Sequence, residues 1–257
     1  MMKLGMCASF DRLPLIKEIG YDYAEFALVQ VAELSDEAFC ELKEKVQETG
    51  LPVSRMNSML PGRDSLYTEE GQRAQLAYLK KAYRRAAELG VTTVVFGSAG
   101  ARMRPDQVPE DEAYQILAGF LKKAAPIARE NGIRIAIEPL RKDECNILNS
   151  VDDGRRLMAL AGEENVAVLA DLYHMMAGGE DVDTLLKEPH VVHTHIAEKE
   201  VRSFPKADDA CFPFYEQFIG NLKAVGYEGG VSVEGQSADF ENDAREAFAV
   251  LDRLRKA

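Results

Sequence analysis

Eight short β-rich runs alternate with longer amphipathic stretches along this 257-residue chain, and this alternation constrains the fold more than any other feature. Each run of aliphatic and β-branched residues is followed by a segment whose apolar residues recur at helical spacing. The expected strands cover 3–6, 23–28, 52–56, 92–96, 134–138, 166–171, 191–196 and 231–234. The expected helices cover 13–19, 35–48, 68–89, 111–130, 151–160, 182–187, 214–225 and 241–255, with Ser35 as the N-cap of the second.

Repeated strand–helix units favour parallel strands, and eight of them can close into a barrel of about 250 residues. We therefore expect an α/β fold, a single (β/α)₈ TIM barrel spanning residues 1–257. Glycines stand where several expected helices end and can adopt the left-handed conformation needed there; they are Gly50, Gly90, Gly132 and Gly226. A doubly wound open sheet is the main alternative, although no GxGxxG motif follows the first strand.

The amino-acid composition limits the kinds of molecule that this chain is expected to bind. The formal net charge of −12 disfavours binding to a phosphate backbone, which depends on lysine and arginine. No run of about 18 apolar residues predicts a membrane span, and the first residues lack the apolar stretch of a secretory signal. We therefore expect a cytoplasmic protein that binds neither nucleic acid nor membrane. The four cysteines are scattered without a CxxC pair, which favours reduced thiols.

Four polar residues end strands that are otherwise apolar. They are Glu138, Asp171, His195 and Glu234, at the ends of the fifth to eighth expected strands. In a closed barrel the carboxyl ends of neighbouring strands meet at one mouth, so these side chains are expected to converge. Taken singly, each carboxylate could be a helix cap, whereas four polar residues at consecutive strand ends indicate one site.

A divalent cation would hold such a cluster together. Three carboxylates packed closely repel one another and raise each other's pKa, and a bound cation removes this repulsion. Oxygen ligands with one imidazole suit Mn²⁺, our first candidate, with Mg²⁺ or Co²⁺ as alternatives. His193 alternates with His195 along one strand, so it is expected to support the metal ligands.

The polar segments resemble a known family. They are Ile137-Glu-Pro-Leu-Arg-Lys-Asp-Glu-Cys-Asn146, Asp171-Leu-Tyr-His-Met175, His193-Thr-His195 and Val233-Glu-Gly235. Together they resemble the xylose-isomerase-like sugar isomerase and epimerase superfamily, and most closely its ketose 3-epimerase branch, which includes the D-tagatose and D-psicose 3-epimerases. The likeness is strong over the last four strands and vague before them.

The resemblance implies a role for each matching residue. Glu138, Asp171, His195 and Glu234 would bind the metal, and Glu138 and Glu234 would also act as catalytic acid and base. Substrate contacts are implied for Glu144, His174 and Arg202. The simpler interpretations are that Glu144 and Arg202 are solvated surface charges and that His174 only begins a helix. The small residues of 96–102 favour a plain loop.

The expected chemistry is proton transfer beside a ketone. Removing that proton creates an enediolate, whose charge a metal can stabilise. One carboxylate would take the proton and another would return one from the opposite face. The predicted enzyme is a metal-dependent isomerase or epimerase of a ketose or related small hydroxyketone. Ketose epimerases often place large aromatic residues against the sugar, and the absence of tryptophan here favours a shorter substrate or one other than a free ketohexose.

The sequence is also compatible with other functions. Hydroxypyruvate isomerisation and dehydration of an inosose would use similar carboxylates. A multi-zinc apurinic endonuclease resembles the superfamily but needs more histidines than the four present. A non-catalytic barrel subunit would bind metal without exchanging a substrate proton. Association into a homo-oligomer is expected by analogy alone.

Overall fold

Eight parallel strands close into one barrel in the computed structural model, which describes residues 1–187 and 189–257. Each strand pairs with the next one in the sequence, and the eighth pairs with the first. The strands are β1 (Lys3–Cys7), β2 (Tyr23–Ala27), β3 (Arg55–Asn57), β4 (Thr93–Phe96), β5 (Arg134–Ile137), β6 (Val166–Asp171), β7 (His193–Ile196) and β8 (Gly230–Val233). The (β/α)₈ barrel predicted from the alternation is confirmed.

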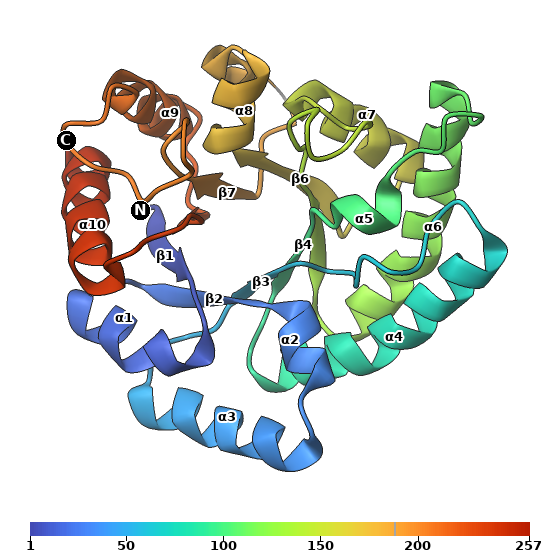
Figure 1. The fold of residues 1–257 in the computed structure, drawn as a ribbon, viewed down its shortest axis with the longest axis horizontal. Helices are drawn as coiled ribbons and strands as arrows, with labels where there is room; N and C mark the ends of the chain where they lie inside the picture. The colour runs from blue at the N-terminus through green and yellow to red at the C-terminus, as the bar shows by residue number, and fades with distance from the viewer. Residues whose placement is uncertain (188) are drawn as a thin grey trace.

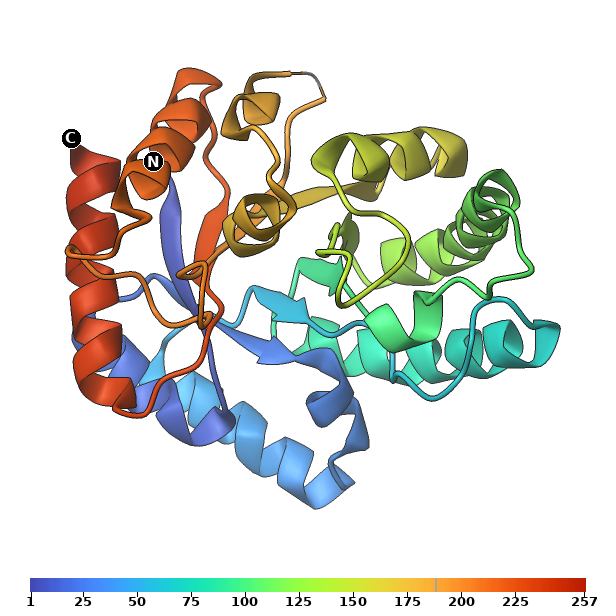
Figure 2. The same ribbon diagram turned by 45° about the horizontal axis from the view of Figure 1, so that its top comes forward.

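Helices surround the strands on all sides (Figures 1 and 2). They are α1 (Leu13–Ile19), α2 (Leu28–Glu33), α3 (Asp36–Thr49), α4 (Glu69–Glu88), α5 (Ala99–Arg102), α6 (Glu110–Glu130), α7 (Val151–Ala161), α8 (Leu172–Gly178), α9 (Phe212–Ala224) and α10 (Phe240–Lys256), with the short 3₁₀ helices η1 (Phe10–Arg12) and η2 (Val182–Leu186). The hydroxyl of Ser35 accepts a hydrogen bond from the Ala38 amide, which confirms the predicted N-cap. Within the described ranges, no helix is both long enough and apolar enough to span a membrane.

Besides the 3₁₀ helix η1, three short α-helices were not predicted. They are α2 and α8, which begin directly after β2 and β6, and α5, which lies in the segment expected to be a plain loop. Helices of four to seven residues are too short to show an apolar periodicity. The strand predicted at 52–56 is also shifted, because β3 spans Arg55–Asn57.

Alternate residues along the strands face different surroundings. One set packs outward against the helices in the main hydrophobic core and includes Leu4, Phe26, Val94, Ile135 and Val231. The other set faces the inside of the barrel and includes several buried polar side chains, among them Tyr23, Glu25, His193 and Ser232. The barrel interior therefore carries a polar network directly beneath its mouth.

Two glycines make room for this interior network. A Cβ on Gly5 would lie 2.1 Å from the Tyr23 ring, and a Cβ on Gly230 would lie 2.3 Å from the Tyr23 hydroxyl. The tyrosine therefore fills the space that side chains of β1 and β8 would otherwise occupy.

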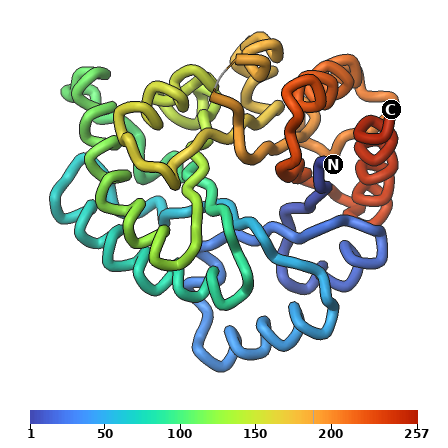
Figure 3. The backbone as a smooth tube through the Cα atoms, turned by 180° about the vertical axis from the view of Figure 1, so that it is seen from behind, coloured from blue at the N-terminus to red at the C-terminus, as the bar shows by residue number. Residues whose placement is uncertain are grey.

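The two ends of the chain are joined through Arg255. Its guanidinium donates to the Met2 carbonyl (3.1 Å) and pairs with Asp22. This contact holds α10 beside β1, and the termini accordingly lie on the same side of the barrel (Figures 1 and 3).

A buried arginine from another helix caps the carboxyl end of helix α2. Arg85, on α4, is 2 % exposed and donates to the carbonyls of Val31, Ala32 and Leu34 at 2.7–3.3 Å. Because the last carbonyls of a helix lack partners within it, this guanidinium satisfies them and ties α2 to α4.

Replacing Arg85 with methionine should leave those carbonyls unpaired and lower the free energy of unfolding by about 2–4 kcal/mol. The neighbouring Arg84 is exposed, so R84M should change stability by less than about 0.5 kcal/mol. Chemical denaturation of both variants measures the difference. Equal stability of R85M and R84M would contradict the role given to Arg85.

Glu180 joins the end of α8 to the start of α7. Its Oε1 accepts from the Val151 amide at 2.9 Å, and burial raises its pKa to about 7. Since the folded state then holds a proton that the unfolded state releases above its ordinary pKa, this group makes stability fall as the pH rises from about 4.5 to 7. E180Q keeps an acceptor without the charge, so its stability relative to wild type should increase between pH 5 and pH 8, as measured by thermal unfolding at each pH. A difference that does not vary with pH would contradict the shift.

Candidate metal centre and active site

The carboxyl ends of β5 to β8 bring four predicted site residues together. Ligand atoms of Glu138, Asp171, His195 and Glu234 all lie within 4.8 Å of one another. The Nδ1 atom of His195 is 2.8 Å from Glu138 Oε1 and 3.2 Å from Glu234 Oε2. The convergence expected from the sequence is therefore present, while metal binding by these residues stays a prediction.

Asp171 has two functions at the end of β6. Its Oδ1 accepts from the Tyr173 amide at 2.8 Å and caps α8. Its Oδ2 lies 3.3 Å from Arg202 Nη2 and 3.5 Å from His174 Nε2. A helix cap and a site ligand are therefore compatible in one residue, because each uses a different oxygen.

Glu138 is placed by a glycine and a buried arginine. A Cβ on Gly97 would lie 2.1 Å from Glu138 Oε2, so a side chain on the residue after β4 would displace this carboxylate. Arg102, which is fully buried on α5, donates to the carbonyls of Phe96 (2.8 Å) and Glu138 (2.7 Å). The segment expected to be a plain loop thus fixes the backbone of Glu138 and leaves the space that its carboxylate occupies.

Glu234 is held from both sides. Asn57 Nδ2 donates to its Oε1 at 2.7 Å, and Arg202 Nη2 donates to its Oε2 at 2.7 Å. The loop that carries Arg202 is fixed by the pairing of Ser203 with Gln236, next to Glu234. Residues from the third, seventh and eighth strand–loop units therefore set the position of one carboxylate.

The carboxylates lack sufficient positive charge. Burial raises the pKa of Asp171 to about 7 despite the nearby Arg202, and burial also raises the pKa of Glu138 despite His195. Burial opposes the ionisation of Glu234 too, but His195 and Arg202 lower its pKa to about 2. Among the residues that the structure describes, two cationic groups, His195 and Arg202, therefore lie close enough to offset the charge of three carboxylates.

These observations fit a divalent cation. The donors are three carboxylates and one imidazole, a set in which hard oxygen ligands predominate. Added positive charge would let Glu138 and Asp171 ionise inside the protein, which burial now opposes. The Nδ1 atom of His195 faces the same point as the carboxylates and would supply the nitrogen ligand.

A cavity of about 210 Å³ opens above the cluster. Its lining includes Asn57, Ser58, Gly97, Ser98, Ala99, Glu138, Leu140, Glu144, His174, Arg202 and Glu234. Ser58 and Arg202 both have positive φ angles, 51° and 53°, a conformation that non-glycine residues adopt at a cost. The volume of this cavity suits a small molecule.

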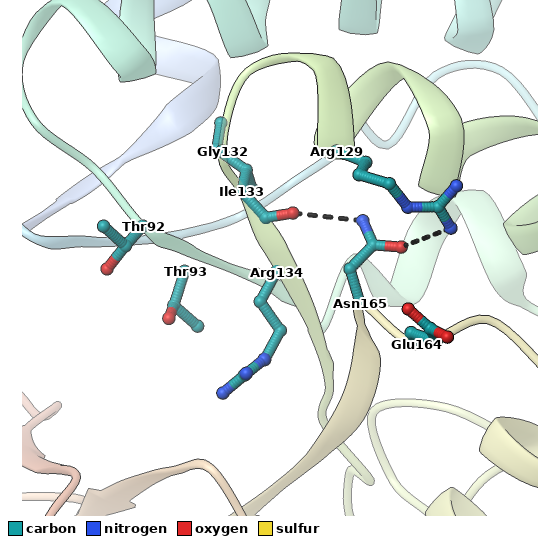
Figure 4. A pocket seen from close by; sticks show the side chains of 8 residues that line it. All are labelled: Thr92, Thr93, Arg129, Gly132, Ile133, Arg134, Glu164 and Asn165. Atoms are coloured by element: carbon teal, nitrogen blue, oxygen red, sulfur yellow. Dashed lines mark hydrogen bonds between the residues drawn. The ribbon is translucent and has the colours of Figure 1, made fainter.

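A larger hollow of about 420 Å³ lies at the other end of the barrel (Figure 4). It is lined by residues near the amino ends of β4, β5 and β6, among them Thr93, Arg129, Arg134 and Asn165. Active sites of such barrels lie at the carboxyl ends of the strands, where the carboxylate cluster is. We therefore place the chemistry in the smaller cavity.

The three residues predicted to contact substrate all line that cavity. His174 Nδ1 accepts from the Arg141 amide at 3.2 Å, which leaves its proton on Nε2, and burial lowers its pKa to about 3. Glu144 Oε1 pairs with Arg141 (2.8 Å) and lies 3.9 Å from Arg202. None of the three is a freely solvated surface group, while substrate contact itself stays a prediction.

Sequence reasoning missed several residues of this site. Asn57 ends β3 as a polar residue, which is the same signal that identified the carboxylates. Glu25 is the one charged residue of a buried strand and binds His195 Nε2 at 3.0 Å. Gly97 and Arg102 gave no comparable signal, because their roles depend on which carboxylate and carbonyls the fold brings beside them.

The fold and the site define a class of protein: a (β/α)₈ barrel with an acidic, histidine-containing pocket at its mouth. The family model described as Xylose isomerase-like TIM barrel matches residues 13–256, and the chain belongs to this family.

Proteins of similar sequence include sugar epimerases and isomerases. The 3-dehydro-D-guloside 4-epimerase of Escherichia coli K12 is 26 % identical over 238 residues, which cover 88 % of this chain and 86 % of that protein. Other curated relatives are ketose 3-epimerases, inosose isomerases and a putative hydroxypyruvate isomerase.

Solved structures share the fold. A D-psicose 3-epimerase determined in the presence of D-fructose superposes with a TM-score of 0.87 at 19 % identity, covering 100 % of both chains. The IOLI protein with a bound zinc atom superposes with a TM-score of 0.79 at 19 % identity, covering 98 % of this chain and 96 % of the other.

Replacing Gly97 with alanine should displace the Glu138 carboxylate and weaken Mn²⁺ binding at least about tenfold. Gly119, within helix α6, is the matched control, because a Cβ there meets nothing within 4 Å. G119A should keep the wild-type affinity and gain about 0.5–1 kcal/mol of stability. Calorimetric titration with Mn²⁺ compares them, and an unchanged affinity of G97A would refute this account of Glu138.

Proposed function

We propose that this protein is a divalent-metal-dependent isomerase or epimerase of a ketose or a related small hydroxyketone. The observation that carries the proposal is the convergence of four side chains of types that can bind a metal. Two of them, Glu138 and Glu234, line one small cavity and could transfer protons there. The activities of its curated relatives, which are sugar epimerases and isomerases, support the proposal.

Glu138, Asp171, His195 and Glu234 would hold the cation. When bound, the cation supplies positive charge that stabilises the negative charge developing on the substrate oxygens during proton removal. Mn²⁺ is our first candidate because oxygen ligands predominate, with Mg²⁺ or Co²⁺ as alternatives.

Glu138 and Glu234 are the proposed acid and base. They follow β5 and β8, which are separated by two strands, so they approach the cavity from different sides. A carboxylate on one side can take the proton from a carbon beside the carbonyl, while the other carboxyl group returns a proton from the opposite side. This sequence of transfers inverts the carbon, and the two glutamates exchange roles in the reverse direction.

The remaining lining orients the substrate. His174 presents an Nε2–H donor, and Arg202 and Glu144 present charged groups at the cavity wall. Asn57 Oδ1 has no hydrogen-bond partner among the described residues, which leaves an acceptor for a substrate hydroxyl. Donors and acceptors around a small cavity suit a polyhydroxylated molecule better than an apolar one.

Two other enzymatic reactions fit the same residues. Hydroxypyruvate isomerisation and chemistry on an inosose both begin with proton removal beside a carbonyl, and relatives with these substrates in their names match the chain. A multi-zinc endonuclease is less well supported, because His195 is the only histidine of the four-residue cluster and His193 is hydrogen-bonded to Glu25.

Solvent deuterium exchange tests the proposal. In D₂O with Mn²⁺, a panel of ketoses, hydroxypyruvate and an inosose should reveal one substrate that gains deuterium beside its carbonyl, detected by NMR. Chelation should stop the exchange and Mn²⁺ should restore it. E138Q and E234Q should each lower turnover at least about 100-fold, because glutamine cannot transfer the proton.

Glu241 provides the matched control, since it is an exposed glutamate on α10 paired with Arg245. E241Q should exchange deuterium at the wild-type rate. Metal binding without exchange on any member of the panel would favour a non-catalytic barrel, and full activity of E234Q would refute the acid–base assignment.

A further inference from the structure

Glu25 is a fully buried carboxylate beneath the proposed metal centre. It lies in the middle of β2, whose other residues are apolar or aromatic, and its exposed fraction is 0 %. Its two oxygens receive hydrogen bonds from three side chains that belong to β7 and β8. A buried charge with this many partners has a specific task in the barrel interior, because burial alone would penalise it.

The two nitrogens of His195 face different groups. Nε2 lies 3.0 Å from Glu25 Oε1, whereas Nδ1 points to Glu138 and Glu234. A neutral imidazole carries one N–H donor and one lone pair, and an ionised carboxylate can only accept. When a cation takes the place of the proton on Nδ1, pairing with Glu25 keeps the remaining proton on Nε2 and leaves the lone pair of Nδ1 directed at the proposed metal centre.

We infer that Glu25 is a positioning residue that fixes the tautomer of His195 and thereby makes Nδ1 its metal-binding atom. The inference rests on the proposed function, because it concerns the same metal centre. Carboxylates that orient a metal-binding histidine in this way typically contribute a factor of 10–100 to metal affinity.

Glu25 is itself held in one orientation. Its Oε2 accepts from Ser232 Oγ at 2.6 Å and lies 2.8 Å from His193 Nε2, while His193 Nδ1 lies 3.1 Å from the Gly230 carbonyl. Rotation of the carboxylate would break these contacts inside the barrel, where water cannot replace them. Oε1 therefore remains directed at His195.

A competing arrangement uses the same residues. Ligand atoms of Glu25, His193 and His195 also lie within 4.8 Å of one another, so a cation could in principle occupy this deeper position. That cation would require Nε2 of His195 as a ligand and would remove its proton. The protonation of Nε2 in the metal-loaded protein separates the two arrangements.

Histidine nitrogen NMR measures this protonation directly. The chain has four histidines, so selective ¹⁵N labelling gives a spectrum with few ring signals. In the wild-type protein loaded with Zn²⁺, we expect His195 to keep its proton on Nε2 and to bind the metal through Nδ1. A metal-bound Nε2 would overturn the inference, and this measurement requires no variant to fold.

A pair of variants measures the energetic contribution. E25Q offers an amide in place of the carboxylate, so it can no longer accept from both His195 and His193, and we expect Mn²⁺ to bind about 10–100-fold more weakly. S232A removes a hydrogen bond from the other oxygen of the same carboxylate and should change the affinity about threefold or less. Calorimetry gives both affinities, and circular dichroism of the metal-free variants checks that each is folded.

The outcomes separate this inference from the proposed function. Equal Mn²⁺ affinities of E25Q and wild type would overturn the role of Glu25 and leave the metal centre standing. A folded wild-type protein that binds no divalent cation would overturn both. Weak binding by E25Q with a mixed His195 tautomer, together with tight binding by S232A, would support the inference.

Discussion

The convergence of three carboxylates on one imidazole is the constraint on which the rest of this structure depends. Glu138 and Asp171, which are buried, and Glu234, which is half-buried, converge on His195 at the mouth of a closed barrel, where solvent screens their repulsion only weakly. The surrounding residues respond to that constraint: Arg202 contributes a positive charge to two of the carboxylates, and Asn57 donates to Glu234. A shortage of positive charge remains, and it is the physical reason for expecting a cation.

The interior of the barrel supports the site from below. Barrels of this kind commonly fill their interior with branched aliphatic side chains. Here Tyr23, Glu25, His193 and Ser232 form a hydrogen-bonded network instead, and Gly5 and Gly230 provide the space for it. Such a network is costly unless its members are paired, so the polar atoms that orient His195 also specify how the strands face one another.

Much of the fold and part of the site were accessible from the sequence. The eight strands and eight of the helical segments follow from local apolar patterns, although the helix expected at 182–187 is the short 3₁₀ helix η2. Polar residues at strand ends identified four side chains that do converge. The short helices α2, α5 and α8 were missed because they are fixed by contacts such as that of Arg85 with the end of α2. Glu25 was missed because its partners on β7 and β8 are more than 160 residues away.

The sequence alone thus determined the order of strands and helices, the closure into a barrel and the chemical character of its mouth, because these depend on periodicity and on residues at strand ends. Only the tertiary structure decided which atoms meet. It directed Nδ1 of His195 toward the carboxylates and Nε2 toward Glu25, and it set Gly97 against Glu138. These contacts depend on the register between strands and on long-range packing, which cannot be predicted from a local pattern of residues.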